Sequence, residues 1–82
     1  MTDAEIYARL TDVMREVFDD ETLEIAPTTS AENVSGWDSQ AHITLIVATE
    51  VRFGIRFRTA EVESLKNVGE LVQLIAKKSA AA

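Results

Sequence analysis

The chain has 82 residues, a formal net charge of −6, a single histidine and no cysteine. A chain of this length forms one domain, here expected to cover residues 1–82, and buries only about 60% of the surface that its unfolded form exposes. That leaves little interior for an enclosed active site, so we do not expect an enzyme. With no thiol and one imidazole, we expect neither a disulfide framework nor a metal site.

Charge and hydropathy also narrow the location and the partners. The first fourteen residues are acidic and amphipathic, unlike a secretory signal, and no apolar run reaches membrane-spanning length. We therefore expect a cytoplasmic protein without a membrane span. Residues 1–38 hold ten acidic and two basic residues, whereas residues 39–82 hold four acidic and six basic ones. The net negative charge and the lack of a basic stripe argue against nucleic acid as a partner.

The start of the chain has the pattern of an amphipathic helix. Thr2 and Glu5 have the spacing of a capping box, in which a hydroxyl and a carboxylate each accept a backbone N–H at the helix start. Apolar residues then recur at helical spacing: Ile6, Leu10, Val13, Met14, Val17 and Phe18. From residue 19 to residue 37 the period disappears and turn-forming residues indicate a long connection, of a length that is often functional. Leu23, Ile25 and Val34 are expected to hold it to the core.

A second helix is predicted from Ser39 to Phe53, and it has two apolar stripes. The first, expected to face the core, contains His42, Leu45, Ile46, Thr49 and Phe53. The second contains Ile43, Val47 and Val51. A core needs only one stripe, so the second is a candidate surface for a partner.

The remaining residues predict a helix end, a short helix and a final helix. Gly54 suits the left-handed conformation that follows many helices. Thr59 is expected to cap a short helix reaching Ser64, and Asn67 with Glu70 to cap the last helix. The sequence therefore predicts an all-α fold, a small four-helix bundle with three main helices, one short helix and a long first loop.

The most informative residues lie where the long loop meets the second helix. In Gly36-Trp37-Asp38-Ser39 the serine falls at a helix N-terminus, where unpaired amides and the helix dipole stabilise a phosphate ester. Asp38 can order the turn or help to hold a divalent cation during a phosphotransfer. The alternative interpretation is that Asp38 and Ser39 only cap the helix. Trp37 is expected to anchor the loop by burial.

Taken together, this arrangement resembles the acyl carrier proteins, which are small acidic four-helix bundles. The resemblance covers nearly the whole chain: an amphipathic first helix, a long loop, Asp-Ser at the start of the second helix, the segment 53–57 (Phe-Gly-Ile-Arg-Phe), a short third helix and an apolar fourth. It implies a carrier that has no catalytic residues of its own. Its 4′-phosphopantetheine arm comes from coenzyme A and holds acyl groups as thioesters.

The resemblance assigns roles to individual residues. Ser39 matches the attachment serine and Asp38 the aspartate before it. It also implies a phosphopantetheinyl transferase and acyl-transferring or acyl-loading enzymes of fatty acid, polyketide or specialised lipid biosynthesis as partners, and a monomeric carrier. The arm would supply the thiol that the chain lacks. The cleft for the cargo is expected to be lined by Phe18, Leu45, Ile46, Ile55, Val62, Leu65, Val68 and Leu71.

Two departures from the family pattern concern docking. Gln40 stands where the family usually has leucine after the serine, and Glu50 is the one acidic residue between Ser39 and Val51, a helix that is typically acidic in the family. We therefore expect a more apolar docking face formed by Gln40, Ile43, Val47 and Val51. This suggests a specialised carrier.

Two other functions fit the same helices. An aminoacyl or peptidyl carrier would use the same arm, and an unmodified helical module would dock a partner through the outer stripe. His42 has the spacing of a general base for Ser39, but a residue at the edge of the core is the better interpretation. Arg52, Arg56 and Arg58 are expected to form a solvated face that balances Glu61 and Glu63, rather than a phosphate site.

Overall fold

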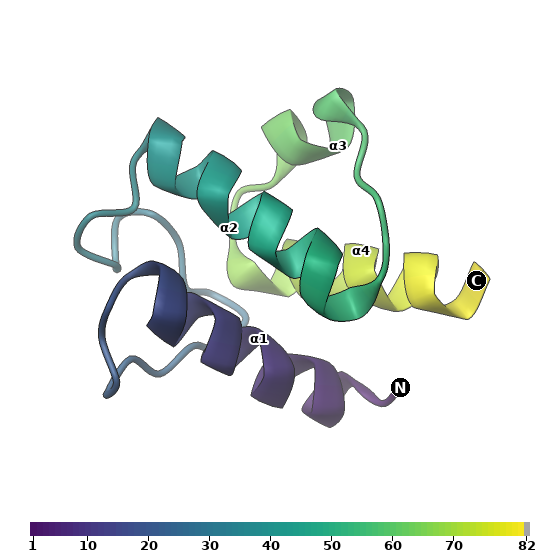
Figure 1. The fold of residues 1–82 in the computed structure, drawn as a ribbon, viewed down its shortest axis with the longest axis horizontal. Coiled ribbons are helices and arrows are strands. Elements are labelled where there is room, and N and C mark those ends of the chain that lie inside the picture. Colours follow the sequence, from purple (N-terminus) through teal and green to yellow (C-terminus); the bar gives the residue numbers. More distant parts are fainter. Residues whose placement is uncertain (82) are drawn as a thin grey trace.

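The chain folds into four helices joined by one long and two short connections. The computed structural model describes the backbone of residues 1–81 and the side chains of residues 1–79, so residue 82 of the expected domain lies outside it. The helices are α1 (Asp3–Val17), α2 (Ser39–Phe53), α3 (Thr59–Ser64) and α4 (Val68–Ala81). Within residues 1–81 there is no strand, and the predicted all-α bundle is confirmed (Figure 1). None of these helices is both long and apolar enough to cross a bilayer.

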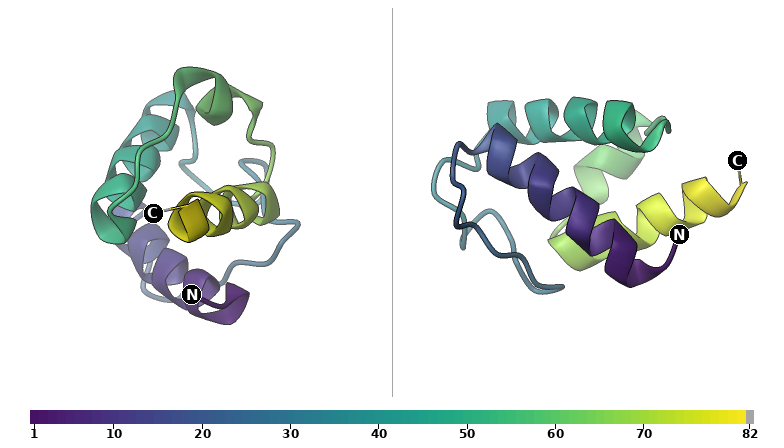
Figure 2. Two further views of the ribbon diagram at one scale, coloured as in Figure 1. Left: turned by 90° about the vertical axis from the view of Figure 1, so that its right-hand side faces the viewer. Right: turned by 60° about the horizontal axis from the view of Figure 1, so that its bottom comes forward.

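Helix α1 is the central packing element. Its capping box is confirmed: the Thr2 Oγ1 accepts the Glu5 N–H at 3.2 Å, and the Glu5 Oε1 accepts the Thr2 N–H at 3.1 Å. One face of α1 packs against both α2 and α4, and α2 runs in the opposite direction to α1 (Figure 1). Figure 2 shows these three helices around a shared interior, with α3 at the edge of the bundle away from α1.

A continuous apolar core joins the three longer helices. Its buried members are Ile6, Leu10, Val13, Met14, Leu45, Ile46, Ile55, Val68, Leu71, Val72 and Ile75. Thr49 is also fully buried, and its hydroxyl is satisfied by donating to the Leu45 carbonyl of its own helix at 2.7 Å. The predicted inner stripe of α2 is therefore confirmed.

The long connection between α1 and α2 is held to this core as expected. Val34 is buried, and Leu23 and Ile25 are partly buried against the core. The guanidinium of Arg15 adds a polar contact, donating from Nε to the Leu23 carbonyl at 2.8 Å.

The same connection also caps α4. The Asn67 Oδ1 accepts the Glu70 N–H at 2.9 Å, which confirms the predicted cap. Two further amides of the first turn donate to carbonyls of the long loop, from Val68 to Thr29 at 2.8 Å and from Gly69 to Pro27 at 2.9 Å. Amides at a helix start have no partner within the helix, so the loop provides acceptors that sequence spacing did not reveal.

The structure confirms the end of α2 and corrects the start of α3. Gly54 follows α2 with φ 66° and ψ 38°, the left-handed conformation that was predicted. Thr59, however, is the first residue of α3, and Arg58 occupies the cap position. Only one of the two bonds of a capping box forms here. Glu61 reaches back to accept the Arg58 N–H at 2.8 Å, but the Arg58 side chain carries no acceptor for the Glu61 N–H.

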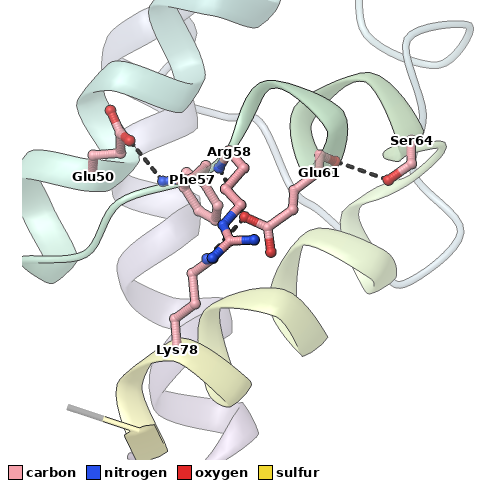
Figure 3. Close-up of polar contacts among 6 residues, drawn as sticks. All are labelled: Glu50, Phe57, Arg58, Glu61, Ser64 and Lys78. Carbon is pink, nitrogen blue, oxygen red and sulfur yellow. Dashed lines mark hydrogen bonds and ion pairs between the residues drawn. The ribbon is translucent and has the colours of Figure 1, made fainter.

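Helix α3 is tethered to α4 by a charged pair (Figure 3). The Lys78 Nζ lies 2.8 Å from the Glu61 Oε1 and 5.8 Å from the centre of the Phe57 ring. The hydrogen bond from Lys78, followed by the one from the Arg58 N–H, lowers the pKa of Glu61 below its ordinary value. The charge of Arg58 acts in the same direction, so the predicted balance of Glu61 holds for this arginine, with Lys78 as the main partner.

The nearest partner of Arg52 is also on another helix. Its guanidinium lies 3.7 Å from the Asp12 carboxylate of α1, and both side chains are largely exposed. Such a pair contributes little to stability.

Replacing Gly69 by alanine tests the contact between α4 and the loop. A Cβ at this position would lie 2.9 Å from the Pro27 carbonyl oxygen, which is backbone and cannot move aside cheaply. We expect Gly69→Ala to lower the free energy of unfolding by about 1–2 kcal/mol, because overpacking outweighs the gain in helix propensity. Urea unfolding measures this, with Gln73→Ala on the exposed side of α4 as the control. A more stable Gly69→Ala protein would contradict the contact.

Replacing Lys78 by methionine tests the tether of α3. The pKa of Glu61 is lowered on folding, so its stabilising contribution is present above its unfolded value of 4.5 and is lost as the pH falls through the folded value. We therefore expect Lys78→Met to lower the melting temperature at neutral pH, and the difference from wild type to shrink in acid. Lys77→Met, at the exposed neighbouring position, should show no such pH dependence. A pH-independent effect of Lys78→Met would rule out the charged pair as its cause.

Candidate functional site

The start of α2 presents Ser39 at an open helix N-terminus. Asp38 is the cap residue: its Oδ1 accepts the Ala41 N–H at 2.8 Å, and its carbonyl accepts the His42 N–H at 2.9 Å. The capping interpretation is therefore confirmed for Asp38. Ser39 is the first residue inside the helix and is exposed, so it does not serve as the cap.

A tight turn aims the chain into this helix. Gly36 has φ 87°, a conformation that side chains disfavour, and the Asp38 N–H donates to the Gly36 carbonyl at 3.0 Å. Between them Trp37 is partly buried against the core, with its ring centre 5.8 Å from that of Phe18. The expectation that Trp37 anchors the loop is confirmed. The turn and the anchored ring together fix where α2 begins.

A hollow of about 670 Å³ lies beside Ser39, between α2, α3 and the start of α4. Its lining includes Trp37, Ser39, His42, Val62, Leu65 and Leu71. The wall of the hollow is thus both apolar and polar. Its apolar side chains come from α3, from the residue after α3 and from α4, and its polar groups come from the start of α2. Thr59, Glu63, Lys66 and Asn67 also contribute to it. Sequence reasoning missed these four, because periodicity within one helix does not show which residues of another helix or of a loop face it.

The eight residues expected to line a cargo cleft lie in two places. Val62, Leu65 and Leu71 line the hollow beside Ser39. The others belong to the core behind it: Leu45, Ile46, Ile55 and Val68 are buried, and Phe18 is partly buried against them. Apolar side chains therefore continue from the hollow into the interior of the bundle.

His42 lies at the edge of the core, as the sequence indicated. Its Nδ1 accepts the indole N–H of Trp37 at 3.2 Å, and its Nε2 lies 3.3 Å from the Val62 carbonyl oxygen. Among the described residues its hydrogen bonds thus reach the loop and α3 and do not include Ser39. This arrangement favours a structural role over that of a general base.

The outer face of α2 is apolar and uncharged. Ile43, Val47 and Val51 are 62%, 52% and 80% exposed, and Gln40 is exposed in the first turn. The Glu50 carboxylate is directed to the connection before α3, where its Oε2 accepts the Phe57 N–H at 2.8 Å (Figure 3). The carboxylate of α2 is thus used inside the fold.

The residues at the start of α2 fit a phosphate-linked arm. Free amides at a helix N-terminus, together with the helix dipole, stabilise a phosphodiester on an exposed hydroxyl. The hollow beside Ser39 can receive an organic chain attached there. The arrangement can therefore present a tethered group, while the tether's own thiol supplies the reactive atom.

Comparisons with known proteins agree with this geometry. A family model described as "Phosphopantetheine attachment site" matches residues 8–75. The acyl carrier protein of Acidothermus cellulolyticus is 33% identical over 78 residues, which cover 95% of this chain and 93% of that protein. The meromycolate extension acyl carrier protein of Mycolicibacterium smegmatis is 30% identical over 76 residues, covering 93% and 77%.

A solved structure extends the similarity to three dimensions. The NMR structure of holo acyl carrier protein from Geobacter metallireducens matches with a TM-score of 0.86 and 43% sequence identity, over 92% of this chain and 86% of that one. Sequence, fold and the open start of α2 lead to one conclusion: the chain belongs to the acyl carrier proteins, which are carriers and not enzymes and bear acyl groups on a covalently bound phosphopantetheine.

Proposed function

We propose that Ser39 is the residue that carries the arm and that residues 1–82 act as one carrier domain. The observation that supports this is the division of roles at the start of α2, where Asp38 caps the helix and Ser39 stays exposed beside the hollow. A phosphopantetheinyl transferase would join the Ser39 oxygen to the phosphate of the arm and release the nucleotide part of coenzyme A. A monomeric state and a cytoplasmic location stay predictions.

We further propose that partner enzymes dock on the outer face of α2, formed by Gln40, Ile43, Val47 and Val51. Support comes from the exposure of these apolar side chains on the helix that begins at Ser39, and from the internal role of Glu50. Burying such side chains gains hydrophobic free energy without ion pairs. The matching patch on acyl-loading enzymes is therefore apolar rather than basic.

We also propose that the cargo enters through the hollow, past Val62, Leu65 and Leu71. Behind these residues the core consists of apolar side chains from several helices, including Leu45, Ile46 and Val68. Helices that pack through side chains can shift apart without breaking backbone hydrogen bonds. The bundle can thus widen around an acyl chain.

Intact-mass analysis tests the attachment residue. Incubation with coenzyme A, magnesium and a broad-specificity transferase should add one phosphopantetheinyl group to the wild-type chain. Ser39→Ala should remove this gain entirely, because the accepting oxygen is gone. Ser35→Ala, in the exposed loop just before the turn, should still be modified. Modification of the Ser39→Ala protein would place the arm elsewhere.

Val47→Glu tests the docking face. A carboxylate at this half-exposed position places charge in an apolar interface, so the rate of enzymatic acylation should fall roughly tenfold. Thermal unfolding should change little, since Val47 lies outside the core. Gln73→Glu, which adds the same charge on the exposed side of α4, should acylate at the wild-type rate. An unchanged rate for Val47→Glu would exclude this face from docking.

A further inference from the structure

We propose that His42 is a latch that ties α3 to Trp37 across the hollow beside Ser39, and that it works only while its ring is neutral. His42 is a positioning residue in this role, because it acts by fixing the mouth of the hollow. The proposal goes beyond the attachment of the arm and can be tested on the chain before the arm is added.

The geometry admits one protonation state of the ring. An indole nitrogen can only donate, so the His42 Nδ1, 3.2 Å from the Trp37 Nε1, must be free of a proton. A peptide carbonyl can only accept, so the Nε2, 3.3 Å from the Val62 oxygen, must carry the proton. Only the neutral Nε2–H tautomer satisfies both contacts.

Helix α3 depends on such contacts because it has little packing of its own. None of its six described side chains is buried. Val62 and Leu65 pack only in part against the core. On the side of α3 that faces α4, the Glu61 Oε1 lies 2.8 Å from the Lys78 Nζ. The bond from His42 is therefore the polar tether of α3 on the side of Ser39.

Protonation of His42 would break the latch at Trp37. The imidazolium carries a proton on Nδ1, which would then face the indole N–H across 3.2 Å. Two donors at this distance repel, so one ring must move. The imidazolium keeps its Nε2 proton and can still donate to the Val62 carbonyl, so the contact that is lost is the link from α3 to Trp37, and α3 can then move with the ring away from the loop.

Other charged groups near the latch must be considered in any titration. Asp38 from the start of α2, Glu63 from α3 and Lys66 after α3 line the same hollow. They remain in place in every variant described below, so a comparison between variants isolates the effect of His42.

The emission of Trp37 reports on the latch directly, because the chain has one tryptophan and one histidine. In the full chain measured without the arm, Trp37 emission should change with the shape of a single-proton transition as the pH is lowered through the range in which imidazoles titrate. His42→Gln keeps a donor and an acceptor on one side chain but does not titrate there, so its emission should stay level. The same pH response in His42→Gln would overturn the proposal.

Hydrogen exchange of the α3 amides tests the mechanical consequence. His42→Leu removes both hydrogen bonds, and amides in residues 59–64 should exchange roughly 2- to 10-fold faster than in wild type. His42→Gln should restore most of the protection. Lys78→Met should also speed exchange in α3 while leaving the pH response of Trp37 intact, since it breaks the other tether.

Two outcomes of the exchange experiment would overturn the latch. Unchanged exchange in α3 of the His42→Leu protein would show that the bond to Val62 carries no constraint. Equal acceleration in α1, α2 and α4 would show that His42 supports the whole fold rather than α3. Both readouts are independent of acyl transfer, so they can fail while Ser39 still accepts its arm.

Discussion

The packing of α1 against both other long helices is the constraint on which the rest of the structure depends. A chain of 82 residues can build only one core, and the buried side chains of α1 form the part of it that faces both α2 and α4. Ile6, Leu10 and Met14 are fully buried there. Once these three helices close on one another, the six-residue α3 remains at the edge of the bundle and is held by partly buried apolar side chains together with a few polar contacts.

The two sides of the hollow are therefore held in different ways. The start of α2 is rigidly placed by the turn at Gly36, the cap at Asp38 and the partly buried ring of Trp37. On the opposite side of the hollow, α3 has no buried side chain and is held by partly buried Val62, by hydrogen bonds and by an ion pair. The proposed entry of the cargo through the hollow would use both properties, because partner enzymes need a fixed attachment point and the cargo needs a wall that can yield. Regions that move are drawn from the least stable part of a fold.

Local signals in the sequence predicted most of the helical framework. The capping box at Thr2 and Glu5, the bounds of α2 and the left-handed Gly54 all depend on residues within a few positions of one another. Such signals act before tertiary structure forms, so they can be read from one chain. The prediction of Thr59 as the cap of α3 was wrong. The Glu61 carboxylate reaches back to the Arg58 N–H, and this bond outweighed the preference of threonine for the cap position.

The contacts that shape the site could be predicted only in part. Exposure of the outer stripe of α2 followed from periodicity, and the family pattern singled out Ser39. Neither source predicted that His42 would bridge Trp37 and Val62, a residue twenty positions away, or that Pro27 would accept a hydrogen bond from α4. These contacts depend on how the helices cross, which no spacing within one segment specifies. For the same reason, sequence spacing did not show that the eight residues expected to line one cleft are divided between the hollow and the core behind it.

The internal role of Glu50 has a consequence for how this carrier meets its partners. Its carboxylate keeps its charge but is bound at the Phe57 N–H, so the charge that could attract a basic enzyme surface lies mainly in the ten acidic residues of the segment 1–38. Long-range attraction from these residues would weaken as ionic strength rises, whereas the apolar face of α2 would act only once the two proteins touch. Discrimination between partners would then lie in how long a complex persists rather than in how often it forms. The fold thus uses one carboxylate to fix a loop and leaves selection to the lifetime of each encounter.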